Sequence, residues 1–208
     1  MNKLDLQRVS CVLIDGIDPN QSAKVLNYCT SLCNFHSVKL FSFEKPNIKY
    51  DYEFIQVKKF TYPEYNRFLI KNLSSYINSD YALIVQTDGY ITNINAWNNA
   101  FLDYDYIGAP WIHGTLHNTR VGNGGFSLRS KRFIERCSWP DININSNQED
   151  IVVCSTNKEL IEKSGLKYAP VEIAAKFSWG GDIPELQRSW NDCFGAHCKI
   201  KEFLDLTK

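Results

Sequence analysis

Residues 81–89 read YALIVQTDG, an apolar run of strand length that ends in an acidic turn. Residues 9–16 repeat this pattern as VSCVLIDG. Short apolar runs bounded by turn residues are typical of buried strands, here expected over 81–86 and 9–15. After the earlier run, Pro19 begins a stretch with apolar residues at helical spacing, which predicts a helix. Strands and helices in this order predict an α/β fold with a mostly parallel central sheet flanked by helices.

The rest of the sequence predicts further strands and helices. The whole chain has 208 residues, a length that predicts a single domain. Further strands are expected at residues 38–43, 54–57, 106–109 and 171–175. Further helices are expected at residues 62–77, 95–102, 130–137 and 149–160, with a weaker helical pattern at 200–206. Ligands of such sheets gather at the carboxyl ends of the strands, where Asp15 and Asp88 are expected to lie.

The composition excludes several classes of protein. Hydrophobic residues make up 44% of the chain and charged residues 22%, which is typical of a globular domain rather than a disordered or collagen-like one. Basic and acidic residues are equal at 23 each, and this balance argues against a nucleic-acid partner. No apolar run is long enough for a transmembrane helix, and the first residues do not read as a signal peptide. Seven scattered cysteines favour a reducing, cytoplasmic environment.

Asp88 and the glycine-rich segment at residues 122–125 (GNGG) are the first candidates for chemistry. A carboxylate held at the end of a buried strand can bind a hard divalent cation, although Thr87-Asp88-Gly89 also suits a plain turn. The glycines allow the backbone to approach a ligand such as a sugar ring closely, and they equally suit a bulge. The segment lacks the spacing of a phosphate-binding P-loop.

A second group of candidates lies near the end of the chain. Glu149 and Asp150 precede an apolar run, where carboxylates stabilise a helix start or act as a general base. His197 can complete a metal site with Asp88, although a single histidine is more often a plain surface or core residue. His113 and His117 either line an acceptor site or lie in a solvent loop. Cys193, His197 and Cys198 cluster locally, but a zinc site needs a fourth ligand and none is evident.

Several blocks appear in a characteristic order. They are residues 86–89 (QTDG), 104–111 (YDYIGAPW), 121–130 (VGNGGFSLRS), 149–150 (ED), 177–178 (FS) and 194–197 (FGAH). This set, over about residues 9–197, resembles a family of GT-A-type glycosyltransferase-like proteins long catalogued as a domain of unknown function. The resemblance implies a Rossmann-like GT-A domain with a donor half at about 9–110 and an acceptor and catalytic half at about 111–208. It also implies transfer of a sugar from a nucleotide-sugar to a glycan or another hydroxyl acceptor, in polysaccharide or glycoconjugate synthesis.

The resemblance further implies roles for individual residues. Asp150 matches the general base of inverting members, with Glu149 beside it, and Asp88 and His197 match the ligands of a manganese or magnesium ion. The expected donor-binding residues are Asp15, Asp88, Gly124, Gly125 and Arg129, and the expected acceptor-binding residues are Trp111, Trp179 and His113. The chain departs from the family twice. Gln86 replaces the first acid of the Asp-x-Asp motif, and Gly180 replaces a later acid for which Asp182 or Glu185 can substitute.

Two alternatives remain open. A sugar-nucleotide-binding pseudoenzyme agrees with the incomplete acidic motif. A sugar-phosphate nucleotidyltransferase has a similar sheet, but it needs a glycine-rich loop with arginine and lysine after the first strand. Residues 15–19 (DGIDP) contain one glycine and no cationic residue, which disfavours this second alternative.

Overall fold

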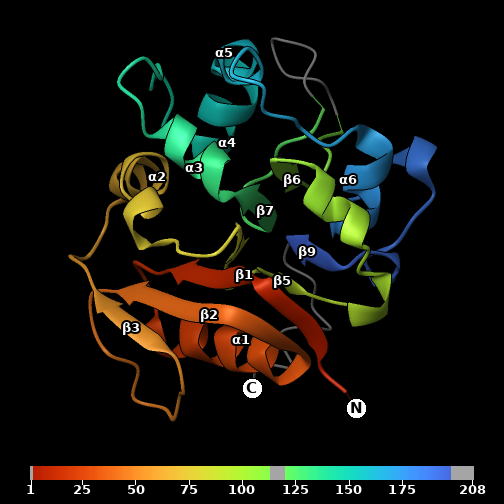
Figure 1. The fold of residues 1–208 in the computed structure, drawn as a ribbon. Helices are drawn as coiled ribbons and strands as arrows, with labels where there is room; N and C mark the ends of the chain where they lie inside the picture. The colour runs from red at the N-terminus through yellow and green to blue at the C-terminus, as the bar shows by residue number, and fades with distance from the viewer. Residues whose placement is uncertain (1, 113–119, 198–208) are drawn as a thin grey trace.

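Six strands form the central sheet of the computed structural model, which describes residues 2–112 and 120–197 (Figure 1). The strands are β1 Leu4–Ile14, β2 Cys33–Ser42, β3 Glu53–Gln56, β4 Tyr81–Val85, β6 Tyr106–Gly108 and β7 Ser127–Ser130. Their order is β3-β2-β1-β4-β7-β6, and only β7 runs antiparallel to its neighbours. The predicted α/β fold with a mostly parallel central sheet is therefore confirmed.

Helices cover both faces of this sheet (Figure 1). Helix α1 (Pro19–Leu32) lies on one face, and α2 (Tyr62–Lys71) and α3 (Lys131–Cys137) lie on the other. Successive side chains of a strand point to opposite faces, so β1 contributes to both cores. Leu13 packs in the hydrophobic cluster that contains α1, whereas Val12 and Ile14 pack in the cluster that contains Phe68 of α2.

A second, smaller sheet carries the end of the described chain. Its strands are β5 (Gly89–Ile91), β9 (Gly195–His197) and β8 (Ser178–Trp179), in the order β5-β9-β8. Strand β9 pairs with β5 in antiparallel register, which places His197 opposite Gly89. The sequence did not predict this sheet. It matters for the site because it brings His197 beside the turn that follows β4.

Some predicted elements need correction. Residues 171–175, expected as a strand, belong to the helix α6 (Val171–Phe177), because Pro170 precedes a segment whose alanines favour helix over strand. The helix expected at 62–77 divides into α2 and a 3₁₀ turn, η1 (Leu73–Tyr76). The helix expected at 95–102 is two 3₁₀ turns, η2 (Ile94–Ala96) and η3 (Asn99–Asp103). Residues 200–206 lie outside the described residues.

The segment expected as one helix at 149–160 is the most irregular. It consists of α4 (Glu149–Ile151), a π-helical turn, η4 (Val152–Thr156), and α5 (Lys158–Glu162). The backbone amide of Asn157 donates a hydrogen bond to the Val152 carbonyl at 3.0 Å, which closes the wide turn, and the side-chain Nδ2 of Asn157 donates to the same carbonyl at 2.9 Å. Two further 3₁₀ turns, η5 (Pro184–Leu186) and η6 (Trp190–Asp192), precede β9.

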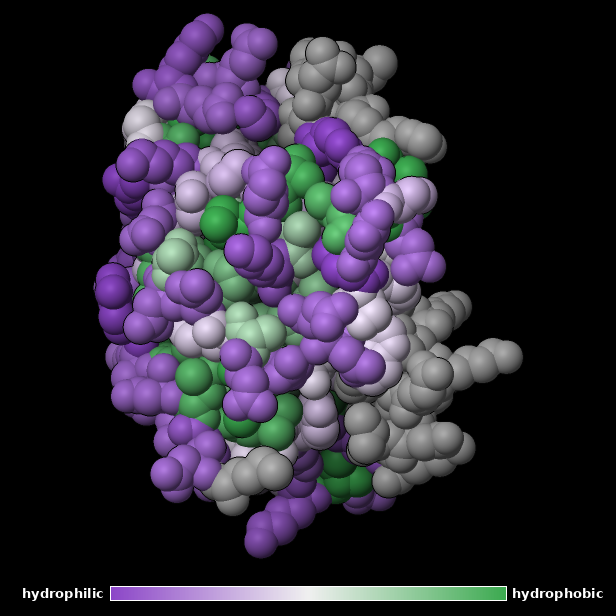
Figure 2. Space-filling model, turned by 90° about the vertical axis from the view of Figure 1, so that its right-hand side faces the viewer, coloured by the Kyte–Doolittle hydropathy of each residue, from purple (hydrophilic) through white to green (hydrophobic). Residues whose placement is uncertain are grey.

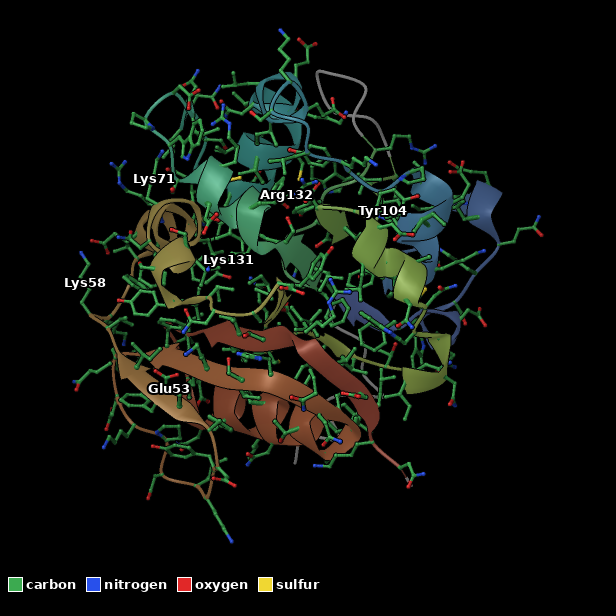
Figure 3. All side chains as sticks on the ribbon, in the orientation of Figure 1. Glu53, Lys58, Lys71, Tyr104, Lys131 and Arg132 are labelled. Carbon is green, nitrogen blue, oxygen red and sulfur yellow. The ribbon has the colours of Figure 1, made fainter. Side chains whose placement is uncertain are left out.

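The outside of the molecule is mixed in character. Glu53 lies on β3 at the edge of the sheet, where it pairs with Lys39 of β2 (Figure 3). The face in Figure 2 is a mosaic in which hydrophobic residues form several small groups between hydrophilic ones. Within the described parts of the chain, no helix combines the length and the apolar character that crossing a bilayer requires.

Cys29 and Cys33 are buried free thiols, and burial raises the pKa of Cys33 to about 12.

Candidate active site

A pocket of about 380 Å³ opens at the carboxyl ends of β1 and β4. Its walls include Asp15 and Ile17 after β1, Tyr62 and Tyr65 of α2, and Gln86 and Asp88 after β4. Asp15 and Asp88 thus lie at one edge of the sheet, as the strand order predicted. Their part in binding a donor stays a prediction.

The Asp15 carboxylate organises the turn that follows β1. Its Oδ1 accepts hydrogen bonds from the amides of Ile17 and Asp18, each at 2.9 Å, and its Oδ2 accepts one from the Ser42 hydroxyl at 2.9 Å. The side chain is almost fully buried. Asp15 therefore shapes the floor of the pocket through the backbone that it holds.

Gln86 and Tyr65 connect β4 to α2 inside the pocket. Gln86 is the residue at which the resemblance implies an acid, and its Nε2 donates a hydrogen bond to Tyr65 Oη at 2.5 Å. Burial raises the pKa of Tyr65, and the nearby Glu149 charge raises it further. Tyr65 is therefore a neutral phenol at neutral pH. No motif in the local sequence marks Tyr65 as a site residue.

Asp88 and His197 meet at the rim of this pocket. The distance between Asp88 Oδ1 and His197 Nε2 is 3.5 Å. On the other side of the ring, Nδ1 contacts the side-chain oxygen of Asn123. This contact fixes the orientation of the imidazole ring, with Nε2 toward Asp88. Asn123 has a left-handed backbone with φ 49°, which asparagine tolerates better than most residues.

The Asp88–His197 pair fits part of the coordination shell of a divalent cation. A carboxylate oxygen and an imidazole nitrogen are suitable ligands. Among the described residues, no group of three or more His, Cys, Asp or Glu side chains is arranged to hold a metal ion. Divalent cations that act on phosphates are commonly held by one or two side chains and completed by the substrate. The two residues therefore fit a cation that arrives with a phosphate-bearing ligand.

Glu149 and Arg129 form a buried ion pair beneath the glycine-rich segment. Arg129 donates to Glu149 from both terminal nitrogens, at 3.0 and 2.8 Å, and also to the Gly124 carbonyl at 3.3 Å. Both side chains are at most 6% exposed. Burial alone would lower the pKa of Arg129, but the Glu149 charge raises it above its ordinary value. The sequence predicted Arg129 as a donor-binding residue; in the structure its guanidinium holds Glu149 and Gly124.

The glycine-rich segment passes close to these side chains. A Cβ on Gly124 would lie 1.8 Å from Glu149 Oε1, and one on Gly125 would lie 2.3 Å from His197 Nε2. Larger residues at either position would collide with the site, which explains why glycine is needed there. The Gly124 amide also donates a hydrogen bond to Asp150 Oδ2 at 3.3 Å. The segment thereby joins the Asp88–His197 pair to the two adjacent carboxylates.

Of the predicted acceptor-binding residues, Trp111 contacts the glycine-rich segment and Trp179 lies on the smaller sheet. The Trp111 indole packs against Gly122, where a Cβ would lie 2.0 Å from the ring. Trp179 lies on β8 beside β9, and its buried indole nitrogen has no hydrogen-bond partner among the described residues. At Gly180 a Cβ would lie 2.6 Å from Asn123 Nδ2, so Asn123 leaves no room there for a larger side chain. His113 and His117 lie outside the described residues.

Of the two candidate substitutes for the acid that Gly180 replaces, Asp182 is exposed, whereas Glu185 has a partner. Glu185 pairs with Arg120 at 2.6 Å. Cys193 donates to the Ala175 carbonyl at 3.1 Å and accepts from Arg188. Cys198 lies outside the described residues. Cys193 therefore contacts α6, two residues before β9 begins.

The architecture is similar to that of solved glycosyltransferases. The chain is similar to the galactosyltransferase LgtC, solved with donor and acceptor sugar analogues, at a TM-score of 0.51 and 12% identity over 95% of both chains. A glycosyltransferase involved in glycosylation of the major capsid of PBCV-1 gives 0.49 and 11% identity over 96% of both chains. A mannosyltransferase from Pyrobaculum calidifontis, solved with GDP-Man and Mn²⁺, gives 0.44 and 9% identity over 77% of this chain and 53% of that one. No curated protein matches the sequence.

The fold is thus that of the GT-A glycosyltransferases, with a candidate site at the edge of the sheet. Residues 48–197 match the family described as "Protein of unknown function (DUF5672)". The protein belongs to this family. The fold that the resemblance implied is confirmed, and the roles that it implied for individual residues stay predictions.

Proposed function

We propose that this protein is a glycosyltransferase that moves a sugar from a nucleotide-sugar donor to a hydroxyl of a glycan or another acceptor. One observation carries the proposal: a continuous set of contacts runs from the pocket through Asp88, His197 and Asn123 to Gly124 and Asp150. A donor in the pocket would direct its sugar toward these residues. Residues at about 9–110 would bind the donor, and residues at about 111–208 would supply the acceptor side and the base.

Asp150 is the proposed general base. Its carboxylate would accept the proton of the acceptor hydroxyl while the hydroxyl oxygen bonds to the anomeric carbon. The bond from that carbon to the diphosphate breaks, and the nucleoside diphosphate leaves with the bonding electrons. Attack on the face opposite the leaving group inverts the anomeric carbon in one step. The Gly124 amide would hold the Asp150 carboxylate in place during this attack.

Asp88 and His197 would hold a manganese or magnesium ion. When bound, such an ion neutralises the charge that develops on the diphosphate. The hydrogen-bond contact with Asn123 keeps the His197 ring oriented with Nε2 toward Asp88. Gly124 and Gly125 would lie beneath the donor sugar, where their missing side chains leave room. Trp111 and Trp179 would stack on the acceptor.

A thermal-shift screen of nucleoside diphosphates and their sugars, with and without manganese, tests the proposal. A ligand that binds only the native state raises the melting temperature by mass action. We expect at least one nucleotide-sugar to raise it more with manganese than without. Transfer to a sugar acceptor, with the product's anomeric configuration read by NMR, should then show inversion. Binding without transfer or donor hydrolysis would instead indicate the pseudoenzyme.

Replacing Asp88 by Asn should remove most of the manganese-dependent part of donor binding. The turn after β4 tolerates asparagine, so the fold should remain. The amide carries no charge and therefore loses its attraction for the cation. Donor titrations with and without manganese, on the wild type and on Asp88→Asn, measure this difference. Equal manganese dependence in both proteins would remove Asp88 from the metal site.

A further inference from the structure

The helical segment that carries Asp150 begins without a cap of its own. Helix α4 starts at Glu149, and the preceding Gln148 side chain makes no capping hydrogen bond. The Glu149 amide donates instead to Asn66 Oδ1 at 2.9 Å, from α2 and 83 residues earlier in the chain. A buried amide without a partner costs about 1 to 3 kcal/mol, so this bond matters for the start of the helix.

Asn66 lies on α2, the helix that forms one wall of the proposed donor pocket. Its Nδ2 donates to the Tyr62 carbonyl at 2.8 Å, in the first turn of α2. Tyr62 and Tyr65 of this helix line the pocket. Asn66 itself is 5% exposed, which leaves little access for water to replace its hydrogen bonds. One amide side chain therefore joins the pocket wall to the backbone directly before Asp150.

We propose that Asn66 is a positioning residue that sets the Asp150 carboxylate relative to the donor pocket. Two contacts hold Glu149: Arg129 holds its carboxylate, and Asn66 holds its amide. Asp150 is the next residue, so the two contacts that hold Glu149 also fix the position of the Asp150 backbone. A displacement of about 1 Å at a reacting group can slow a reaction roughly 100-fold. The proposal rests on the role of Asp150 in the proposed function.

The test compares three variants of the full-length protein. Asn66→Ala removes both hydrogen bonds, whereas the isosteric Asn66→Asp keeps an acceptor oxygen for the Glu149 amide. Asn157→Ala is the matched control, because Asn157 is a buried asparagine whose side chain donates to Val152, in the same helical segment, and to Asn143. The measurements are kcat, the donor dissociation constant, the unfolding midpoint, and hydrogen exchange of a peptide covering residues 148–152.

We expect Asn66→Ala to lower kcat about 10- to 100-fold, with a change in donor affinity of less than about threefold. Exchange at the Glu149 amide should speed up. Asn66→Asp should recover most of kcat. Asn157→Ala should lower the unfolding midpoint by a similar amount but slow transfer much less.

The outcomes separate the two proposals. An unchanged kcat in Asn66→Ala, or equal losses of kcat in Asn66→Ala and Asn157→Ala, would overturn the positioning role. An Asn66→Asp protein as slow as Asn66→Ala would also overturn it, even if the alanine variant folds poorly. If the wild type transfers no sugar while exchange in Asn66→Ala still accelerates, the proposed function has failed, and the role of Asn66 in catalysis fails with it.

Discussion

Replacing Asp150 by Asn should slow sugar transfer by a factor of about 10² to 10⁴, because an amide cannot take the proton of the acceptor hydroxyl. Asparagine keeps the size of the side chain, and its oxygen can still accept the hydrogen bond from the Gly124 amide. The loss should therefore appear in kcat and not in the affinity for the donor. Steady-state kinetics at saturating donor and acceptor, together with a direct donor titration, measure both quantities.

Two variants serve as controls for this result. Asp80→Asn makes the same chemical change at an exposed carboxylate just before β4, where Asp80 pairs with Arg8, and should leave the rate unchanged. Glu149→Gln should slow transfer much less than Asp150→Asn and should mainly lower stability, because buried Arg129 loses its counter-charge. If the two rates fall in the reverse order, the roles of the carboxylates are exchanged. If neither substitution slows transfer, the inverting mechanism is wrong.

Replacing Arg129 by Met should lower the free energy of unfolding by about 3 to 5 kcal/mol, because it leaves one partner of a buried ion pair uncompensated. The Glu149 carboxylate would lose both hydrogen bonds from the guanidinium, and the Gly124 carbonyl would lose its donor. Methionine fills much of the same space, so the effect reports mainly on charge. Urea denaturation should show a lower midpoint with an unchanged slope.

A second substitution and the pH dependence test this explanation. Arg129→Met combined with Glu149→Leu removes both charges and should recover most of the loss. In the single variant, burial raises the folded-state pKa of Glu149 above its unfolded value of about 4.3. The stability deficit should therefore be largest above the folded-state pKa and shrink as the pH falls toward about 4. A loss below about 1 kcal/mol at pH 7, or a deficit that grows on acidification, would contradict the interpretation.

Local sequence patterns were sufficient for the parallel part of the sheet. Strands β1 and β4 lie where apolar runs end in acidic turns, and α1 begins at the predicted proline. Strand β7 was not predicted, because residues 127–130 (SLRS) contain one apolar side chain. Its strand conformation comes from pairing with β4 on one side and β6 on the other. The same is true of β8 and β9, which are too short to show a pattern of their own.

By itself, the sequence determined the order of the main elements, the sheet edge at which Asp15 and Asp88 lie, and the helix start that carries two adjacent carboxylates. Only the tertiary structure decided which carboxylate is buried. Neighbouring helical residues diverge by about 100°, so one of the two must turn inward, but local pattern does not choose between them. Glu149 is the buried one because Arg129 and Asn66 hold it. These partners lie 20 and 83 residues away in the chain, and only the folded sheet and helices bring them to it.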